Sequence, residues 1–302
     1  MKFIENQTFD RERALYGERN LHLKRCTFDG PADGESALKE CCGIQVEDCL
    51  CNLRYPFWHD HGLKISGTEL TPHCRAALWY SDHVEITGSR LHGIKALLEC
   101  SEVTMEDCRI VSAEFGWCVR KLKMLRCSAE SEYFMMRSED LQFFDVRLKG
   151  KYSFQYTKNM TLENCVLDTK DSFWHAEQVT VKNSIIKGEY LAWYSSGVTF
   201  IHCTIIGAQP FCYCKNLKLV DCKMVDTALC FEKSEVNATI TTPVISIKNP
   251  LSGTICAPSV EKIIMDDPNA AGKLCLRSKK TAKWKASPAL EQGATSNFHV
   301  PS

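Results

Sequence analysis

A short segment recurs along almost the whole chain, and it constrains the fold more than any other feature. Its copies include NLHLKRCTF, GIQVEDCLC, EVTMEDCRI, NMTLENCVL, GVTFIHCTI and NLKLVDCKM. The repeats begin at Met1, Asn20, Gly43, Gly62, His83, Glu102, Lys121, Asp140, Asn159, Gln178, Gly197, Asn216 and Glu235. Ten of the twelve intervals between these starts share the same 19-residue length, and the other two are longer, at 23 and 21. We interpret the two longer intervals as loop insertions, the first at the turn-rich segment GPADGES.

A 19-residue unit with alternating apolar residues is too short for a helix pair and fits one coil of a parallel β-helix. The second and fourth places, such as Val103 and Met105, are expected to face inward from one strand. The seventh and ninth places, such as Cys108 and Ile110, are expected to do so from a second strand. Because parallel crossovers are overwhelmingly right-handed and no six-residue period is present, we predict an all-β, right-handed, single-stranded solenoid. It would contain about 13 coils, each one 19-residue repeat.

The rhythm of the repeat changes near the C-terminus. Pro243 to Asp267 departs from the 19-residue spacing while staying rich in β-forming residues. We expect the parallel β-helix with its end caps to span residues 1–267. Residues 268–302 are polar and basic, with Lys279 and Lys280 among them, and are expected to cover the cap or to be partly disordered.

The chain contains 18 cysteines, far more than an ordinary protein of 302 residues. No Cys-x-x-Cys pair occurs, so neither a metal site nor an iron–sulfur cofactor is expected. The seventh place of the repeat is Cys26, Cys49, Thr68, Ser89, Cys108, Cys127, Val146, Cys165, Ser184, Cys203, Cys222 and Thr241. Most of the cysteine excess therefore fills one column of small side chains at a tight corner.

The charge balance disfavours two classes of partner. Lys plus Arg and Asp plus Glu number 37 each, so the formal net charge is zero. Without a basic excess, neither nucleic acid nor an anionic membrane surface is an expected partner. The sequence begins MKFIENQTFD, without the basic and apolar pattern of an export signal, which predicts a cytoplasmic protein.

Aromatic residues recur late in successive repeats, in YPFWHD, AALWYS, FGWCV, SFWHA, LAWYSS and PFCYC. The fifteenth place is Leu15, Leu38, Phe57, Leu78, Leu97, Gly116, Met135, Phe154, Phe173, Ala192, Phe211 and Cys230. The sixteenth place is Tyr16, Lys39, Trp58, Trp79, Leu98, Trp117, Met136, Gln155, Trp174, Trp193, Cys212 and Phe231. The seventeenth place is Gly17, Glu40, His59, Tyr80, Glu99, Cys118, Arg137, Tyr156, His175, Tyr194, Tyr213 and Glu232. One lateral face of the solenoid is therefore predicted to be aromatic.

Neighbouring side chains on a strand point to opposite faces, so one of the two bulky columns must face outward. The sixteenth place includes Lys39 and Gln155, whereas the fifteenth has no polar residue, which favours an outward sixteenth place. A local bulge would reverse this and expose the Phe and Tyr columns instead. The predicted ligand-binding residues are Trp58, Trp79, Trp117, Trp174, Trp193 and Tyr194. A contiguous aromatic surface is typical of a binding face, and we predict a carbohydrate ligand, with oligo- and polyuronides among the candidates.

Several of these stretches resemble the bacterial family catalogued as domain of unknown function 3737. The resemblance rests on RERALYGERNL, YPFWHD, RAALWYSD, YSFQYTKNMTLENC, DSFWHAEQVTV, GEYLAWYSSGVTFIHCTI and NPLSGTICAP, and covers roughly residues 1–267. It implies a right-handed parallel β-helix of the pectin-lyase-like type, with no established activity. The hydrogenase label that some members carry is not expected to apply, because no cluster-binding cysteine spacing is present.

Two classes of function remain open at this point. An enzyme of the polysaccharide lyase or glycoside hydrolase type would draw on the seventeenth place, where the catalytic candidates are Glu99, Arg137, Tyr156 and His175. A lyase needs a cation and a base, whereas a hydrolase needs a closer carboxylate pair than Glu99 and Glu114 are expected to make. The alternative is a non-enzymatic scaffold that uses the aromatic face to form homo-oligomers or to bind protein partners.

Overall fold

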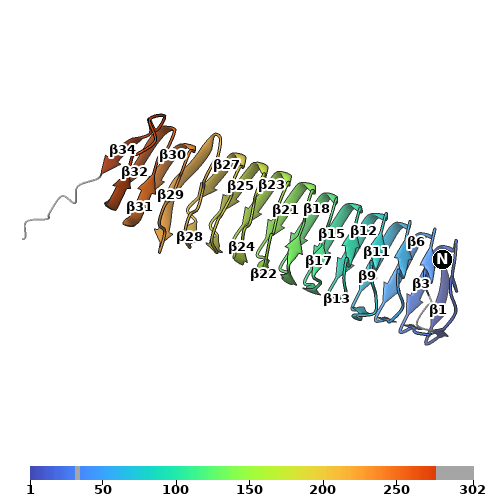
Figure 1. The fold of residues 1–302 in the computed structure, drawn as a ribbon. Coiled ribbons are helices and arrows are strands. Elements are labelled where there is room, and N and C mark those ends of the chain that lie inside the picture. The colour runs from blue at the N-terminus through green and yellow to red at the C-terminus, as the bar shows by residue number, and fades with distance from the viewer. Residues whose placement is uncertain (31–34, 277–302) are drawn as a thin grey trace, which may run out of the picture.

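The computed structural model describes residues 1–30 and 35–276, which form a rod of stacked coils with the N-terminus at one end (Figure 1). These residues contain strands and turns and no helix. The prediction of an all-β parallel solenoid is confirmed, because every named strand pairing is parallel and joins neighbouring coils. Most of the polar and basic segment 268–302, including Lys279 and Lys280, lies outside the described residues.

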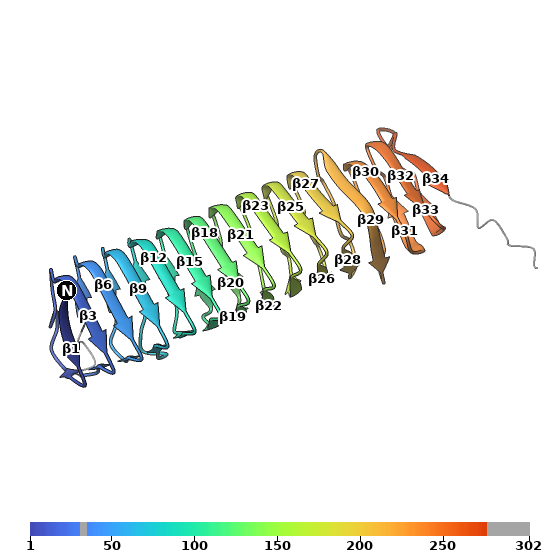
Figure 2. The ribbon, with the colours of Figure 1, turned by 180° about the vertical axis from the view of Figure 1, so that it is seen from behind.

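The first side of the rod is a long sheet whose strands lie side by side along the rod (Figure 2). Its strands are β1 (Lys2–Glu5), β3 (Arg19–Lys24), β6 (Cys42–Glu47), β9 (His61–Ser66), β12 (Asp82–Thr87), β15 (Ser101–Glu106), β18 (Arg120–Leu125), β21 (Glu139–Phe144), β23 (Lys158–Glu163), β25 (Glu177–Lys182), β27 (Ser196–Ile201), β29 (Leu217–Val225), β30 (Glu235–Ile240), β32 (Ser252–Ala257) and β34 (Lys273–Leu276). These fifteen strands bound fourteen turns, one more than the predicted thirteen coils.

The second and third sides are built from shorter strands. The second side contains β2 (Thr8–Phe9), β4 (Thr27–Phe28), β7 (Leu50–Cys51), β10 (Glu69–Leu70), β13 (Arg90–His92), β16 (Arg109–Val111), β19 (Ser128–Ser131), β22 (Arg147–Lys151), β24 (Val166–Lys170), β26 (Ile185–Lys187), β28 (Thr204–Ile206) and the end of β29. The third side contains β5 (Leu38–Lys39), β8 (Phe57–Trp58), β11 (Leu78–Trp79), β14 (Leu97–Leu98), β17 (Glu114–Phe115), β20 (Tyr133–Phe134), β31 (Val244–Lys248) and β33 (Val260–Ile264). The coil is therefore three-sided, and its third side is mostly turns.

The strand register follows the repeat. Val103 pairs with Leu122 and Ile110 with Ala129, so both pairs keep the 19-residue spacing. Phe28 pairs with Cys51 across a longer interval, which places the first insertion in the turn after β4, as predicted. Most other strand pairs along the rod also keep the 19-residue spacing. Equivalent residues of successive repeats therefore lie directly above one another.

The core consists of side-chain columns from the three sides. The fifteenth place faces inward as predicted, since its side chains are buried in every coil from Leu15 to Cys230. Phe154 and Phe173 stack at 5.0 Å between ring centroids, and Phe115 and Phe134 stack at 5.5 Å. In-register parallel strands place equivalent side chains next to each other in adjacent coils. Aromatic pairs at these centroid distances stabilise the fold.

The coil after Asn216 departs from the predicted columns by one residue. Phe231, predicted at the outward sixteenth place, is buried and stacks on Phe211 at 5.7 Å. The amide of Tyr213 correspondingly donates to the carbonyl of Glu232, one residue further along than the 19-residue rhythm requires. An extra residue in the preceding turn therefore shifts this coil, a local insertion that the periodicity did not reveal. Beyond residue 267, β34 continues the first sheet by pairing with β32.

The seventh-place column explains the cysteine content. In each of its cysteines the Sγ donates to the backbone carbonyl two residues earlier, at 3.2 to 3.5 Å. Thr68, Ser89 and Ser184 make the same bond with their hydroxyls, at 2.9, 2.8 and 2.6 Å. Ten of the twelve positions in this column therefore have a small side chain that donates to the same carbonyl, a property that Cys, Ser and Thr share. Val146 fills the corner without a donor, and Thr241 donates to the carbonyl of Cys222 instead.

Thiol reactivity offers a direct check of this arrangement. Fourteen of the eighteen cysteines are buried, Cys42 and Cys256 are half-buried, and Cys118 and Cys275 are exposed. Burial raises the pKa of Cys165 to about 11, so its thiolate is scarce at neutral pH. We expect an aromatic disulfide reagent at pH 8 to modify Cys118 and Cys275 fastest and the fourteen buried thiols only after denaturant is added. Rapid modification of most thiols in native protein would contradict the buried columns.

Candidate functional site: an aromatic row on the third side

The seventeenth place forms a continuous row along the third side. From Gly17 to Tyr213, the backbone N–H of each of its residues donates to a carbonyl of the next coil, as from Tyr156 to Trp174 and from His175 to Trp193. Each such step moves one coil along the rod. In the shifted coil, Lys233 takes the place of Glu232 in this row. We call the four consecutive aromatic members, Tyr156, His175, Tyr194 and Tyr213, the tyrosine row.

The rings of the tyrosine row are stacked on one another. Successive centroids lie 4.9, 5.2 and 4.7 Å apart, and successive planes are nearly parallel, at 5°, 9° and 7°. Tyr156 and Tyr194 are 46% and 47% exposed, and His175 is also exposed. Because the ring faces cover each other, the row presents ring edges to solvent, with their hydroxyl and imidazole groups available for hydrogen bonds.

The catalytic candidates occupy this same row. Arg137 precedes Tyr156 by one coil, and its guanidinium carbon lies 5.9 Å from the Tyr156 ring centroid. Glu99 lies two coils before Arg137, with Cys118 between them. Burial raises the pKa of the Cys118 thiol, and the nearby Glu99 carboxylate adds to that effect. The structure thus brings Arg137, Tyr156 and His175 onto adjacent coils, while Glu99 is further away.

A second carboxyl group lies near the row. Asp171 occupies the thirteenth place between Tyr152 and Tyr190, and it is 7% exposed. Burial raises its pKa above the ordinary range for aspartate, although Lys170 and Lys151 oppose that shift. A carboxyl group whose pKa is raised by burial, in a surface row of polar groups, is one feature of candidate acid–base residues.

The tryptophans face outward as predicted, but they are half-buried and do not form one continuous ladder. Trp58 stacks on Trp79 at 5.2 Å, and Trp174 stacks on Trp193 at 5.5 Å. Trp117 is separated from both pairs, since its neighbours in the column are Leu98 and Met136. The indole faces within each pair cover each other, so the tryptophans do not offer the flat row of faces expected for sugar stacking.

The indoles also have a structural role that the sequence did not indicate. Nε1 of Trp117, Trp174 and Trp193 donates to the carbonyl of the residue 16 positions later, at 3.2, 2.7 and 2.8 Å. Gln155 Nε2 makes the equivalent bond to the carbonyl of Asp171 at 3.1 Å. These bonds tie each coil to the corner of the next. They also explain why a glutamine can occupy this column.

Sequence reasoning missed one buried acid altogether. Asp60 follows the row residue His59 and is completely buried. It belongs to a column otherwise made mainly of small residues, which we call the eighteenth-place column: Cys41, Asp60, Ser81, Cys100, Val119, Ser138, Thr157, Ala176, Ser195 and Cys214. Aligning this column in the same way as the seventh place would have identified an acid among thiols and hydroxyls.

Two further properties of the described residues bear on function. No group of three or more His, Cys, Asp or Glu side chains within residues 1–30 and 35–276 is arranged to hold a metal ion. In the same ranges, no helix has the length and apolar character needed to cross a membrane.

The three-sided coil and its in-register columns define a parallel β-solenoid protein, with an aromatic row on its third side. The chain belongs to the family described as protein of unknown function (DUF3737), whose match spans residues 2–276. This confirms the resemblance found in the sequence. No curated protein matches the chain.

Several solved structures share the solenoid form at low identity. A mutant tailspike protein of E. coli bacteriophage HK620, in complex with a hexasaccharide, is 10% identical with a TM-score of 0.38, covering 86% of this chain and 65% of that chain. The Dettilon tailspike protein is 10% identical with a TM-score of 0.37, covering 91% and 62%. The A-module of a mannuronan C-5 epimerase from Azotobacter vinelandii is 8% identical with a TM-score of 0.28, covering 90% and 87%. This chain thus covers less than two thirds of the tailspike chains, and similarities of this size carry no functional argument.

Proposed function

We propose that this protein binds a carbohydrate chain along the tyrosine row. The observation that carries the proposal is the exposure of Tyr156, His175 and Tyr194 in register on consecutive coils. A ligand lying parallel to the rod would meet the same kind of contact at every coil, about 4.8 Å apart. Hydroxyl and imidazole groups can exchange hydrogen bonds with sugar hydroxyls, while the ring edges pack against sugar C–H groups.

The backbone at this corner has a left-handed conformation in successive coils, whatever the side chain. Tyr156, His175, Tyr194 and Tyr213 have φ angles of 58°, 54°, 59° and 61°, in the left-handed region. That conformation costs about 1–2 kcal/mol for a residue with a side chain. Each ring stack returns only about 0.5–1.5 kcal/mol, so the row contributes little net stability. The first coil has Gly17 at the equivalent position, so the corner does not require an aromatic residue.

Arg137 favours an acidic sugar as the ligand. Its guanidinium lies at the start of the row, where it would pair with the carboxylate of a uronate residue bound against Tyr156. An oligouronide is therefore the ligand class that we propose. Lyase chemistry would require a base beside that sugar, and Tyr156 and His175 are the row residues that we propose for that role.

The test is a titration with oligogalacturonate and a neutral oligosaccharide of equal length, followed by tryptophan fluorescence. Wild type is expected to bind the acidic chain, and Tyr194→Ala to weaken binding by about tenfold or more, because it removes the centre of the contact surface. Tyr16→Ala is the matched control, since Tyr16 is 56% exposed on the same side at the far end of the rod. Arg137→Gln should reduce the preference for the acidic chain.

Two results would count against this function. If neither saccharide binds wild type, or if Tyr194→Ala binds as tightly as wild type, the row is not a carbohydrate site. Sedimentation of the same two proteins then decides the alternative. A change of oligomeric state in Tyr194→Ala alone would assign the row to contact between copies of the chain.

A further inference from the structure

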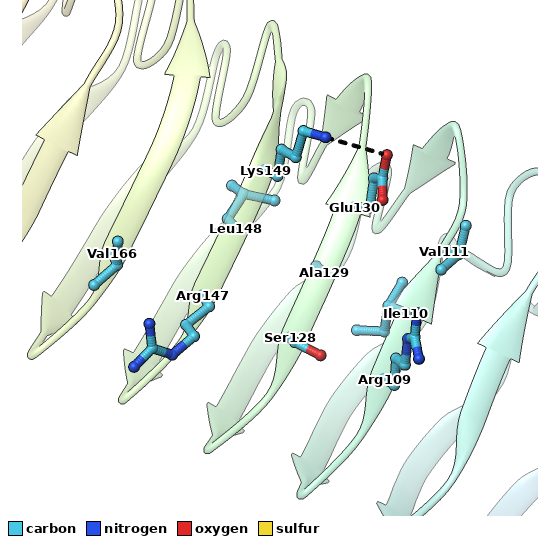
Figure 3. Close-up of a pocket in the computed structure, with 10 residues that line it drawn as sticks. All are labelled: Arg109, Ile110, Val111, Ser128, Ala129, Glu130, Arg147, Leu148, Lys149 and Val166. Carbon is cyan, nitrogen blue, oxygen red and sulfur yellow. Dashed lines mark ion pairs between the residues drawn. The ribbon is translucent and has the colours of Figure 1, made fainter.

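A trough crosses the second side of the rod along β19 (Figure 3). Its floor is Ser128, and its walls carry Arg109 from β16 on one side and Arg147 from β22 on the other. The depression has a volume of about 440 Å³, and a second one of about 420 Å³ shares Arg109, Ser128 and Arg147 with it. The trough exists because a serine occupies the coil between two arginines of the same column.

The charges of this column are arranged unlike those beside it. On one side Asp107, Arg126 and Asp145 alternate in sign from coil to coil, and Arg126 bonds to Asp107 at 2.8 Å. On the other side Glu130 and Lys149 are adjacent and lie 3.9 Å apart. These neighbouring columns therefore compensate their own charges. Alternation of sign between adjacent strands is the stabilising arrangement.

The arginine column alternates in sign only at its first charged pair, Glu69 and Arg90, and not beyond it. Arg90 pairs in register with Arg109, which places two like charges on adjacent strands. Arg109 in turn pairs with Ser128, and Ser128 with Arg147. Arg109, Arg126 and Arg147 line the second depression together with Asp107 and Asp145, so three basic side chains stand against two acidic ones. The first depression is lined by Arg109, Arg147 and Lys149 with Glu130 as its acidic residue, so both depressions have an excess of positive charge.

We infer that this trough binds a tetrahedral oxyanion, a phosphate or sulfate group, between Arg109 and Arg147 and above Ser128. The two arginines are two coils apart, about 9.6 Å between backbones. Both guanidinium groups point away from Ser128 in the structure (Figure 3), so each long side chain would turn toward the serine when an anion binds. A guanidinium group donates in a fork that matches phosphate and sulfate oxygens, and the Ser128 hydroxyl supplies a third donor from the floor. This site lies on a different side of the rod from the tyrosine row and does not depend on the proposed function.

The test is calorimetric titration of the full chain with inorganic phosphate, inorganic sulfate and glucose 6-phosphate. Saturable binding to wild type is expected, and Arg109→Gln and Arg147→Gln should each weaken it by about tenfold, since charged hydrogen bonds are the strong ones. Ser128→Leu should abolish binding by filling the floor while leaving both arginines in place. Tighter binding of glucose 6-phosphate than of phosphate would identify an ester group as the ligand, and the reverse would identify the free ion.

Arg90→Gln is the matched control, because Arg90 belongs to the same column but does not line the trough. It is expected to change the affinity by less than about twofold, the size of a screened long-range effect. Equal losses in Arg90→Gln and Arg147→Gln would overturn the inference, since they would show only general attraction to a basic surface. Absence of saturable binding to wild type below about 10 mM would also overturn it. Tyr194→Ala should bind phosphate as wild type does, which separates this result from the carbohydrate test.

Discussion

Asp60→Asn is expected to remove most of the pH dependence of stability between pH 5 and 8 and to make the protein more stable than wild type at pH 8. Asp60 is completely buried, and burial raises its pKa to about 8, with the nearby Glu40 adding to the shift. Its Oδ1 accepts a hydrogen bond from the backbone N–H of Cys41 at 2.8 Å. Its Oδ2 is buried and has no hydrogen-bond partner among the described residues. An ionised carboxylate is costly in such a place.

The eighteenth-place column shows how the protonated acid fits. Cys100 and Ser138 each donate to a carbonyl two residues earlier, Leu98 at 3.3 Å and Met136 at 3.3 Å. A protonated Asp60 has an O–H that can donate in the same way, while its other oxygen accepts from Cys41. An asparagine side chain keeps both an acceptor and a donor without any charge. It therefore serves as the neutral equivalent of the protonated acid.

The direction of the effect follows from proton counting. Between about pH 4, where an unfolded aspartate titrates, and about pH 8, the folded state holds one more proton than the unfolded state. The free energy of unfolding of wild type should therefore fall as pH rises through this window, by up to about 1.4 kcal/mol per pH unit. Above about pH 8 the folded protein also ionises and the slope disappears. The amide side chain of the Asp60→Asn variant has no proton to lose, so its profile should lack this slope.

Urea denaturation of both proteins at pH 5, 6, 7 and 8 measures this difference. The matched control is Asp226→Asn, because Asp226 is an exposed acid in a turn, and it should leave the slope of wild type unchanged. Parallel pH profiles for wild type and Asp60→Asn would show that Asp60 ionises in the folded protein at an ordinary pH. The buried acid would then have no role in the pH dependence.

Phe154→Ala is expected to lower the free energy of unfolding by about 3–5 kcal/mol. Phe154 is 1% exposed and stacks on Phe173, with Phe134 and Phe143 edge-on at 5.4 and 5.3 Å. Truncation would leave a cavity among these rings. Because coils above and below are held by their own backbone ladders, the cavity has little freedom to collapse.

Phe144→Ala provides the control, because Phe144 is a phenylalanine on the outer face of the same coil. Phe144 points outward from β21, is half-buried, and has Lys123 Nζ 5.8 Å from its ring centroid. Its truncation should cost clearly less, about 1–2 kcal/mol, since the ring lies on the outer face with part of its surface already in solvent and leaves no enclosed cavity. Equal losses in the two variants, measured by chemical denaturation, would contradict the inward assignment of the fifteenth place.

The columns were predictable to the extent that the repeat was regular. The burial of Leu97, Phe154 and Phe173 followed from the 19-residue spacing together with the absence of polar residues in their column. The facing of Phe231 was predicted wrongly, because a one-residue insertion in a turn moves every later side chain of that coil by one place. The half-burial of Trp174 was not predicted either, since its indole bonds to the carbonyl of Tyr190 in the next coil.

The two candidate sites could likewise be predicted only in part from the sequence. Tyr156, His175 and Tyr194 could be placed in one row from their spacing, because any in-register solenoid stacks equivalent positions. Spacing could not show that their ring faces cover each other, since that depends on side-chain torsions and on the left-handed turn. The trough between Arg109 and Arg147 depends on what neighbouring columns do with their own charges, so it became visible only in three dimensions.

By itself, the sequence determined that this chain coils with a 19-residue period and which of its residues share a column. It could do so because backbone hydrogen bonding between parallel strands repeats at every coil, so the period alone sets the neighbours. Only the tertiary structure decided which side chains in those columns are open to ligands. Side-chain exposure depends on how rings stack, which groups donate to the backbone carbonyls and how charges pair between coils. These interactions do not repeat every 19 residues.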